Sequence, residues 1–97
     1  MDRRLPISAY ASYSDLRIKT NENIIKHLVD IIERLDTSIA ITTSNTANND
    51  EKEYCLLQLN HLRLKFETLY NNLVTNTAFI RERRSALHHL PEEDSRN

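Results

Sequence analysis

The fold of this chain is decided by one stretch, residues 50 to 90, which reads DEKEYCLLQLNHLRLKFETLYNNLVTNTAFIRERRSALHHL. Apolar side chains recur through it at alternating steps of four and three residues, and two polar residues continue the same steps. This spacing is typical of one face of a long α-helix that packs against other helices. The stripe consists of Cys55, Leu59, Leu62, Phe66, Leu69, Leu73, Asn76, Ile80, Arg83, Leu87 and Leu90.

A second stripe with the same steps precedes it and predicts another helix over residues 12 to 42. Ser12 followed by Asp15 resembles a capping box and predicts where this helix begins. Ile24, Ile31 and Val29 lie beside the stripe and make its apolar face wider than one partner helix can cover. The sequence therefore favours a bundle of three or more helices. The stripe consists of Ile18, Asn21, Ile25, Leu28, Ile32, Leu35, Ile39 and Thr42.

The residues between the stripes, 43 to 49, have short polar side chains and no apolar period, which predicts a loop. Asp50 followed by Glu53 is a second capping-box-like pair, so the second helix is predicted over residues 50 to 90. A loop this short favours an antiparallel hairpin, in which the longer second helix would overhang the first. Residues 1–11 are predicted to be a lead, because Pro6 argues against an earlier helix, and residues 91–97 an acidic tail.

The composition supports an all-α fold. With Gly 0 and Pro 2 among 97 residues, the chain lacks what hairpin turns, bulges and phosphate-binding loops require. Two long helices have no third layer to close a core around them. We therefore expect an all-α antiparallel helical hairpin with heptad stripes that completes a multi-helix bundle or coiled coil with partner chains.

Charge and hydropathy restrict the class of partner. Thirteen basic and fourteen acidic residues give a net charge of -1, which provides no global attraction to nucleic acid or to an anionic membrane. The single cysteine excludes an internal disulfide. No run of about eighteen apolar residues is present, and the first six residues, MDRRLP, lack the apolar core of a signal peptide. A nuclear or cytoplasmic protein without a membrane segment is expected.

The residues that could carry chemistry do not converge. His27 and His61 fall at outward positions of different helices, and the adjacent His88 and His89 point in different directions, whereas metal ligands must meet at one point. Cys55 lies within the stripe, where a free cysteine acts as a small buried hydrophobe. No serine, histidine and acid are placed to activate one another. The sequence predicts no enzyme, cofactor, metal site or small-molecule substrate.

A basic cluster near the end of the second helix, Arg81, Arg83 and Arg84, could be a docking patch for an acidic surface. It is also the basis of an alternative function, a homo-oligomeric nucleic-acid accessory protein, because phosphate binding needs such a basic end. Against that alternative, cations favour helix C-termini in any case, Glu82 and the acidic tail dilute the patch, and no aromatic residues interleave for base stacking.

The partners are predicted to be other helical subunits. Asn21, Asn76 and Arg83 interrupt the stripes, and each is better placed opposite a different residue than opposite its own copy, which favours a hetero-bundle over a homodimer. Asn21 either sets the register, as a buried Asn can, or lies near a frayed end. Leu57 and Leu64 form a partial second apolar line. The predicted interface comprises Ile18, Ile25, Leu28, Ile32, Leu35, Ile39, Leu59, Leu62, Phe66, Leu69, Leu73 and Ile80.

One order of short segments suggests a family. Residues 13–16 (YSDL), 24–28 (IIKHL), 69–73 (LYNNL) and 89–91 (HLP) follow one another in a pattern that resembles the Mediator subunit 22 family. The resemblance spans roughly residues 13 to 91. It implies that the hairpin pairs with another small helical hairpin in a four-helix bundle of the head module of this RNA polymerase II coactivator, in the nucleus. Kinetochore and vesicle-tethering complexes also use short subunits of this shape and stay as alternatives.

Overall fold

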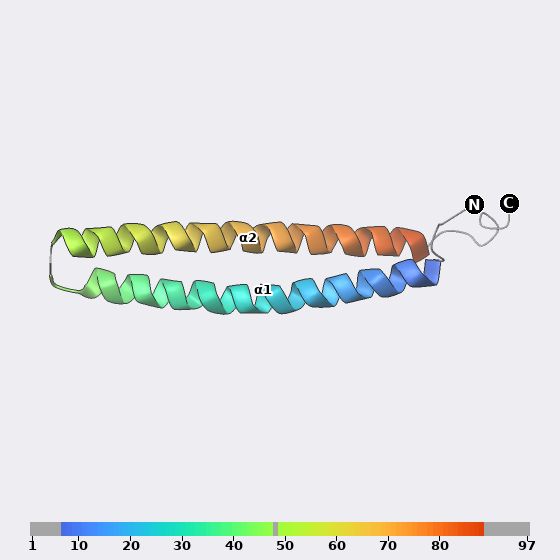
Figure 1. The fold of residues 1–97 in the computed structure, drawn as a ribbon, viewed down its shortest axis with the longest axis horizontal. Coiled ribbons are helices and arrows are strands. Elements are labelled where there is room, and N and C mark those ends of the chain that lie inside the picture. Colours follow the sequence, from blue (N-terminus) through green and yellow to red (C-terminus); the bar gives the residue numbers. More distant parts are fainter. Residues whose placement is uncertain (1–6, 48, 89–97) are drawn as a thin grey trace.

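The computed structural model describes residues 7–47 and 49–88, and the side chains of residues 12–47 and 49–86. Two helices, α1 (Ile7–Ser44) and α2 (Asp50–His88), run antiparallel in a narrow hairpin (Figure 1). The predicted all-α antiparallel hairpin is therefore confirmed. Predictions about residues 1–6, His89, Leu90 and the tail 91–97 lie outside the described residues.

The first helix begins earlier than the sequence suggested. α1 starts at Ile7, directly after Pro6 in the sequence, whereas the predicted start was Ser12. Proline breaks a helix interior but is tolerated at a helix start, where its missing N–H would have no intrahelical partner. Ser12 and Asp15 consequently lie inside α1 and do not cap it. α1 and α2 have 38 and 39 residues, so the predicted overhang of the second helix was wrong.

The second helix begins at Asp50, and the residue that caps it is Asn49. The backbone N–H of Lys52 donates to Oδ1 of Asn49 at 2.9 Å, which satisfies one of the free donors of the first turn. Asp50, Glu51 and Glu53 lie in that turn, where negative charge suits the helix dipole. The ammonium group of Lys52 also donates to the carbonyl oxygen of Asn45 at 2.7 Å, which ties α2 to the connecting loop.

The face of α1 that lies against α2 is the predicted one. Every member of the stripe from Ile18 to Thr42 is buried or half-buried, and Ile31 joins it as a half-buried neighbour. Ile24 and Val29, which widen the stripe on its two sides, are exposed. We call the contact between the two helices the seam.

Only part of the predicted apolar face of α2 lies in the seam. Its central row, Leu59, Phe66, Leu73 and Ile80, lies in the seam as expected. The second row in the seam is an inner row that the stripe did not include, while the predicted outer row is exposed. The inner row is Leu56, Arg63, Tyr70, Thr77 and Arg84, and the outer row is Cys55, Leu62, Leu69, Asn76 and Arg83. Cys55 is thus an exposed free cysteine, and its prediction as a buried hydrophobe was wrong. Leu87 lies outside the described side chains.

Contacts across the hairpin explain which row faces α1. Arg63 pairs with Asp36, and Arg84 pairs with Asp15. Thr77 accepts a hydrogen bond from Asn21. Both α2 rows alternate with the central row at steps of three and four, so periodicity alone does not distinguish them. The polar groups of α1 select the inner row, because long arginines and a small threonine can meet them.

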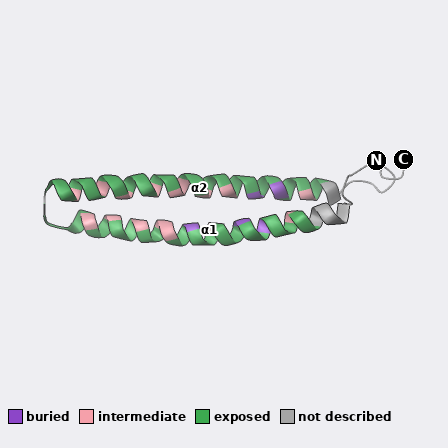
Figure 2. Ribbon diagram, in the orientation of Figure 1, coloured by how far each residue is buried: buried purple, intermediate pink, exposed green. Residues whose placement is uncertain are grey.

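Burial along the hairpin is uneven (Figure 2). Among the described side chains, the buried ones are Ile18, Asn21, Thr77 and Ile80 in the half of the seam away from the loop, and Leu28 near its middle. Toward the loop the seam residues are only half-buried. Two helices can cover one stripe of each other and no more. Large apolar side chains therefore stay exposed along both helices, which is consistent with packing against partner chains.

Candidate protein interface

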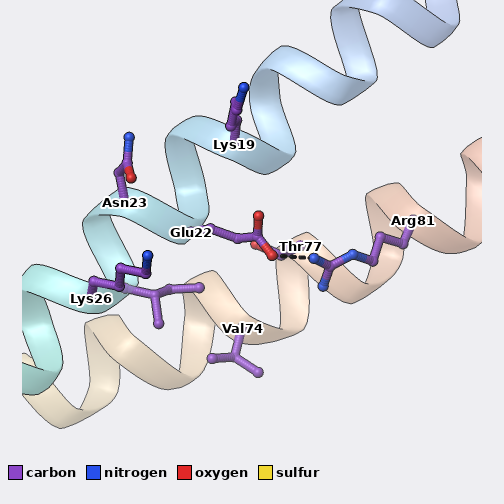
Figure 3. A pocket seen from close by; sticks show the side chains of 8 residues that line it. Lys19, Glu22, Asn23, Lys26, Val74, Thr77 and Arg81 are labelled. Carbon is purple, nitrogen blue, oxygen red and sulfur yellow. Dashed lines mark hydrogen bonds and ion pairs between the residues drawn. The ribbon is translucent and has the colours of Figure 1, made fainter.

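The two sides of the seam differ in chemistry. On one side, which we call the charged flank, three ion pairs link the helices. Nε of Arg84 lies 2.8 Å from Oδ1 of Asp15, Arg81 pairs with Glu22, and Arg63 pairs with Asp36. Figure 3 shows Arg81 reaching from α2 to Glu22 on α1. These pairs are at least partly exposed, so they orient the helices more than they stabilise them.

Arg63 is the centre of the largest of these groups. Its guanidinium donates to Asp36 across the seam and to Glu67 one turn further along α2. The hydrogen bond to Asp36, followed by the one to Glu67, raises the pKa of Arg63 above its ordinary value. Since that ordinary value is already far above neutral, this cross-helix link keeps its charge at every pH at which the protein would be handled.

Two open hollows lie along the charged flank. The first, of about 520 Å³, is lined by charged residues that include Lys19, Lys26, Glu22 and Arg81 and by the apolar Ile25 and Val74 (Figure 3). The second, of about 380 Å³, lies between Val29, Glu67 and Tyr70. Val29 and Val74 are the exposed apolar residues near the middle of this flank.

The opposite side of the seam is apolar. It is located by Arg17, whose Nη2 donates to Oδ1 of Asn76 at 3.5 Å. In an antiparallel pair, one heptad forward on α1 corresponds to one heptad back on α2. The same positions recur one heptad further along each helix, which puts Ile24 and Ile31 of α1 and Leu62 and Leu69 of α2 on this side of the seam. We call Ile24, Ile31, Leu62 and Leu69 the apolar flank.

The side chains of the apolar flank remain accessible in the hairpin. Leu62 is 43% exposed and Leu69 is 45% exposed, while Ile24 is also exposed and Ile31 is half-buried. Beside these four residues, the next row outward is polar on each helix, with His27 and Arg34 on α1 and Lys65 and Asn72 on α2, and it continues to the exposed Ile41 and Phe79. An apolar strip with polar borders is the usual form of a surface that receives another helix.

Toward the loop, the same side of the hairpin ends in an open hollow of about 450 Å³. Ile41, Cys55 and the carboxylate-bearing Glu51 contribute to its walls. Ile41 and Cys55 are exposed, so the accessible apolar surface continues past Leu62 to the end of α1. A partner helix lying along the apolar flank could therefore contact these apolar side chains as well.

The structure places most of the predicted interface residues in the seam. There they contact the other helix of the same chain, and their role toward a partner stays a prediction. Leu62 and Leu69, in contrast, lie on the apolar flank. The sequence marked Ile24 and Ile31 as extra apolar width, but the helix pairing that puts them on the same side as Leu62 and Leu69 could not be read from it. The seam members are Ile18, Ile25, Leu28, Ile32, Leu35, Ile39, Leu59, Phe66, Leu73 and Ile80.

The arginines of the predicted basic patch are divided among different contacts. Arg81 and Arg84 pair with Glu22 and Asp15 on the charged flank. The guanidinium carbon of Arg83 lies 5.8 Å from the ring centre of Phe79, a cation–π distance. Two of these cations are therefore already engaged with carboxylates of α1.

Asn21 forms a polar cluster inside the seam. It is buried, and its Nδ2 donates to Oδ1 of Asn76 and to Oγ1 of Thr77, both at 3.1 Å. The hydroxyl of Thr77 in turn donates to the carbonyl oxygen of Leu73 at 2.7 Å. The interpretation of Asn21 as part of a frayed, solvated end was wrong. Because these hydrogen bonds form only in one alignment of the helices, Asn21 is placed to set the register.

Asn21→Leu is expected to leave stability unchanged or to raise it, but to loosen the register. Thr77 keeps its bond to Leu73 and Asn76 is exposed, so no buried polar group is left without a partner. Amide NMR spectra should show more than one set of signals, or sedimentation should show mixed oligomers. Asn23→Leu at an exposed position is the matched control and should give one species. A single unchanged species for Asn21→Leu would contradict the register role.

The remaining candidate residues are scattered over the surface. His27 and His61 are exposed on the outward faces of α1 and α2. Among the described residues, no three His, Cys, Asp or Glu side chains lie close enough to hold a metal ion. Within the same part of the chain, neither helix has a segment long and apolar enough to cross a bilayer.

Comparison with known proteins adds no relative. No protein-family model, curated protein or solved structure matches this chain. The case for function therefore depends on the geometry of the hairpin and on its surface.

Proposed function

We propose that this chain is a non-enzymatic structural subunit of a multiprotein complex and that it assembles by packing its exposed apolar side chains against helices of other subunits. The observation that carries the proposal is the apolar flank, which lies beside a thin seam. Leu62 and Leu69 are each more than two-fifths exposed, next to Ile24 and Ile31. Contiguous apolar strips of this kind on soluble proteins mark interaction sites.

Burial of the flank supplies the driving force in this proposal. Each square ångström of apolar surface removed from water contributes about 25 cal/mol, so covering several exposed Leu and Ile side chains gives a few kcal/mol in total. The same helices would also cover the half-buried part of the seam toward the loop, where the hairpin shields its own apolar residues least. Assembly would thus stabilise the fold as well as connect the subunits.

For the identity of the complex, we propose the Mediator head module, which would place the protein in the nucleus and in RNA polymerase II transcription. The support for this choice is the order of short sequence segments that resembles the Mediator subunit 22 family. Kinetochore and vesicle-tethering complexes are the alternatives within the same class of function. The nucleic-acid alternative loses support, because Arg81 and Arg84 are already paired with Glu22 and Asp15.

Affinity purification of the tagged chain from its own cell type, followed by mass spectrometry, tests the proposal. We expect stoichiometric recovery of other helical subunits at moderate salt. Mediator head subunits would support the proposed complex, whereas kinetochore or tethering proteins would keep the subunit function and replace the complex. Recovery of the chain alone, monomeric in sedimentation, would contradict the proposed function.

A further inference from the structure

The two sides of the hairpin differ in charge: the side of the apolar flank is mainly basic, whereas the other side carries acids and bases in similar numbers. Arg17, Arg34, Lys65 and Arg83 lie on the side of the apolar flank, on its own rows or on the next row outward. In the described part of the chain, the acidic residue on that side is Glu51, at the loop end. The other side carries the acids Asp15, Glu22, Glu33, Asp36, Glu53 and Glu67 together with the bases Lys19, Lys26, Arg63, Arg81 and Arg84.

The basic side chains beside the apolar flank stay available to a partner. Arg34 is 80% exposed, and its contact with Asp30 is a 3.4 Å pair within α1 that points away from the seam. Arg83 lies over Phe79, and Arg17 donates to the neutral amide of Asn76. None of these three is paired with a carboxylate of the other helix. The apolar flank is therefore a strip with positive borders.

We propose that the apolar flank receives a helix of a different protein whose apolar stripe is bordered by Asp and Glu. This inference rests on the proposed function and names the chemistry of the partner. In a helical interface, the apolar stripes provide the affinity, and the charges beside them select the partner and its orientation. Acidic borders would lie opposite Arg34 on one side and Lys65 on the other.

A second copy of the chain is a poor occupant of this surface. A two-fold symmetric dimer places the same patch on both subunits, so the apolar flank would have to pack on itself. That arrangement would bring the positive borders of both copies together, and like charges across an interface disfavour binding. The charge distribution thus selects a hetero-partner, which the polar interruptions of the stripes also favoured.

Two designed helical peptides serve as probes. Both carry the same Leu and Ile stripe, which is bordered by Glu in one peptide and by Lys in the other. Binding to the full chain is measured by fluorescence anisotropy. We expect the Glu-bordered peptide to bind about tenfold more tightly at low salt, since a few exposed ion pairs together give a factor of that size. The difference should shrink at about 0.5 M salt, where such pairs are screened.

Charge-reversal variants connect the preference to the residues. In the double variant Arg34→Glu and Lys65→Glu, we expect the preference between the peptides to reverse. The matched control is Lys19→Glu with Lys26→Glu, which makes the same change in charge on the side of the charged flank and should leave the preference as in the wild type. Circular dichroism of each variant confirms that the helices persist, because all four positions are exposed.

Three results would overturn the inference. Equal binding of the two peptides, or tighter binding of the Lys-bordered one, would refute the acidic partner, although the subunit function stands if purification recovers a complex. Binding of neither peptide, together with recovery of that complex, would place the partner on another surface. A wild-type dimer that Leu62→Asp with Leu69→Asp converts to a monomer would identify the occupant as a second copy.

Discussion

Replacing Leu28 with Ala is expected to lower the free energy of unfolding of the isolated hairpin by about 3 kcal/mol, within the usual 2 to 5 kcal/mol for such a truncation. Leu28 is 4% exposed and is among the most buried side chains of the seam. No third layer stands behind it that could collapse into the cavity. Urea unfolding of wild type and variant, followed by circular dichroism, measures the difference.

Leu57→Ala is the matched control for this experiment. It removes the same atoms from a side chain that is 67% exposed on α2, so the free energy of unfolding should change by less than about 0.5 kcal/mol. Similar losses for the two variants would show that the seam is not the source of stability. A loss at Leu28 alone would assign that stability to the contact between α1 and α2.

The double variant Leu62→Asp with Leu69→Asp is expected to abolish recovery of partner subunits while the hairpin keeps its helicity. Both side chains are more than two-fifths exposed in the isolated hairpin, so an aspartate at either position can remain in water. In a complex the same positions would be covered, and burying an unpaired carboxylate costs several kcal/mol. Parallel affinity purifications of wild type and variant measure the loss, and circular dichroism reports the helicity.

Leu57→Asp with Leu64→Asp provides the corresponding control. These leucines lie one heptad apart on α2, on the other side of the central row, and they are 67% and 60% exposed. The control adds the same charge and the same loss of helix propensity, yet partner recovery should stay close to that of the wild type. If this control variant lost the partner while Leu62→Asp with Leu69→Asp kept it, the docking surface would be the line of Leu57 and Leu64.

The two experiments separate folding from docking. Leu28 lies inside the seam, so its truncation acts on the hairpin itself, whether or not a partner is present. Leu62 and Leu69 lie beside the seam, so their replacement acts mainly on what the hairpin binds. A protein that behaves as proposed should lose stability in the first case and partners in the second.

Some features of this protein follow from local physical chemistry and could be predicted from the sequence. The absence of glycine and the two stripes predicted an all-α hairpin, and the stripe of α1 from Ile18 to Thr42 faces α2 throughout. The central row of α2 was also correct. These features depend on the spacing of apolar residues within one helix. That spacing can be read directly from the amino-acid sequence.

Other features depend on how the two helices pack against each other. The inner row of α2 faces α1 because Arg63, Thr77 and Arg84 find partners there, and heptad spacing treats this row and the outer row alike. That choice exposes Leu62 and Leu69, and the antiparallel pairing places them on the same side of the seam as Ile24 and Ile31. Both the apolar flank and the basic residues that border it depend on pairings between residues far apart in the chain, which the periodicity of a single helix does not contain.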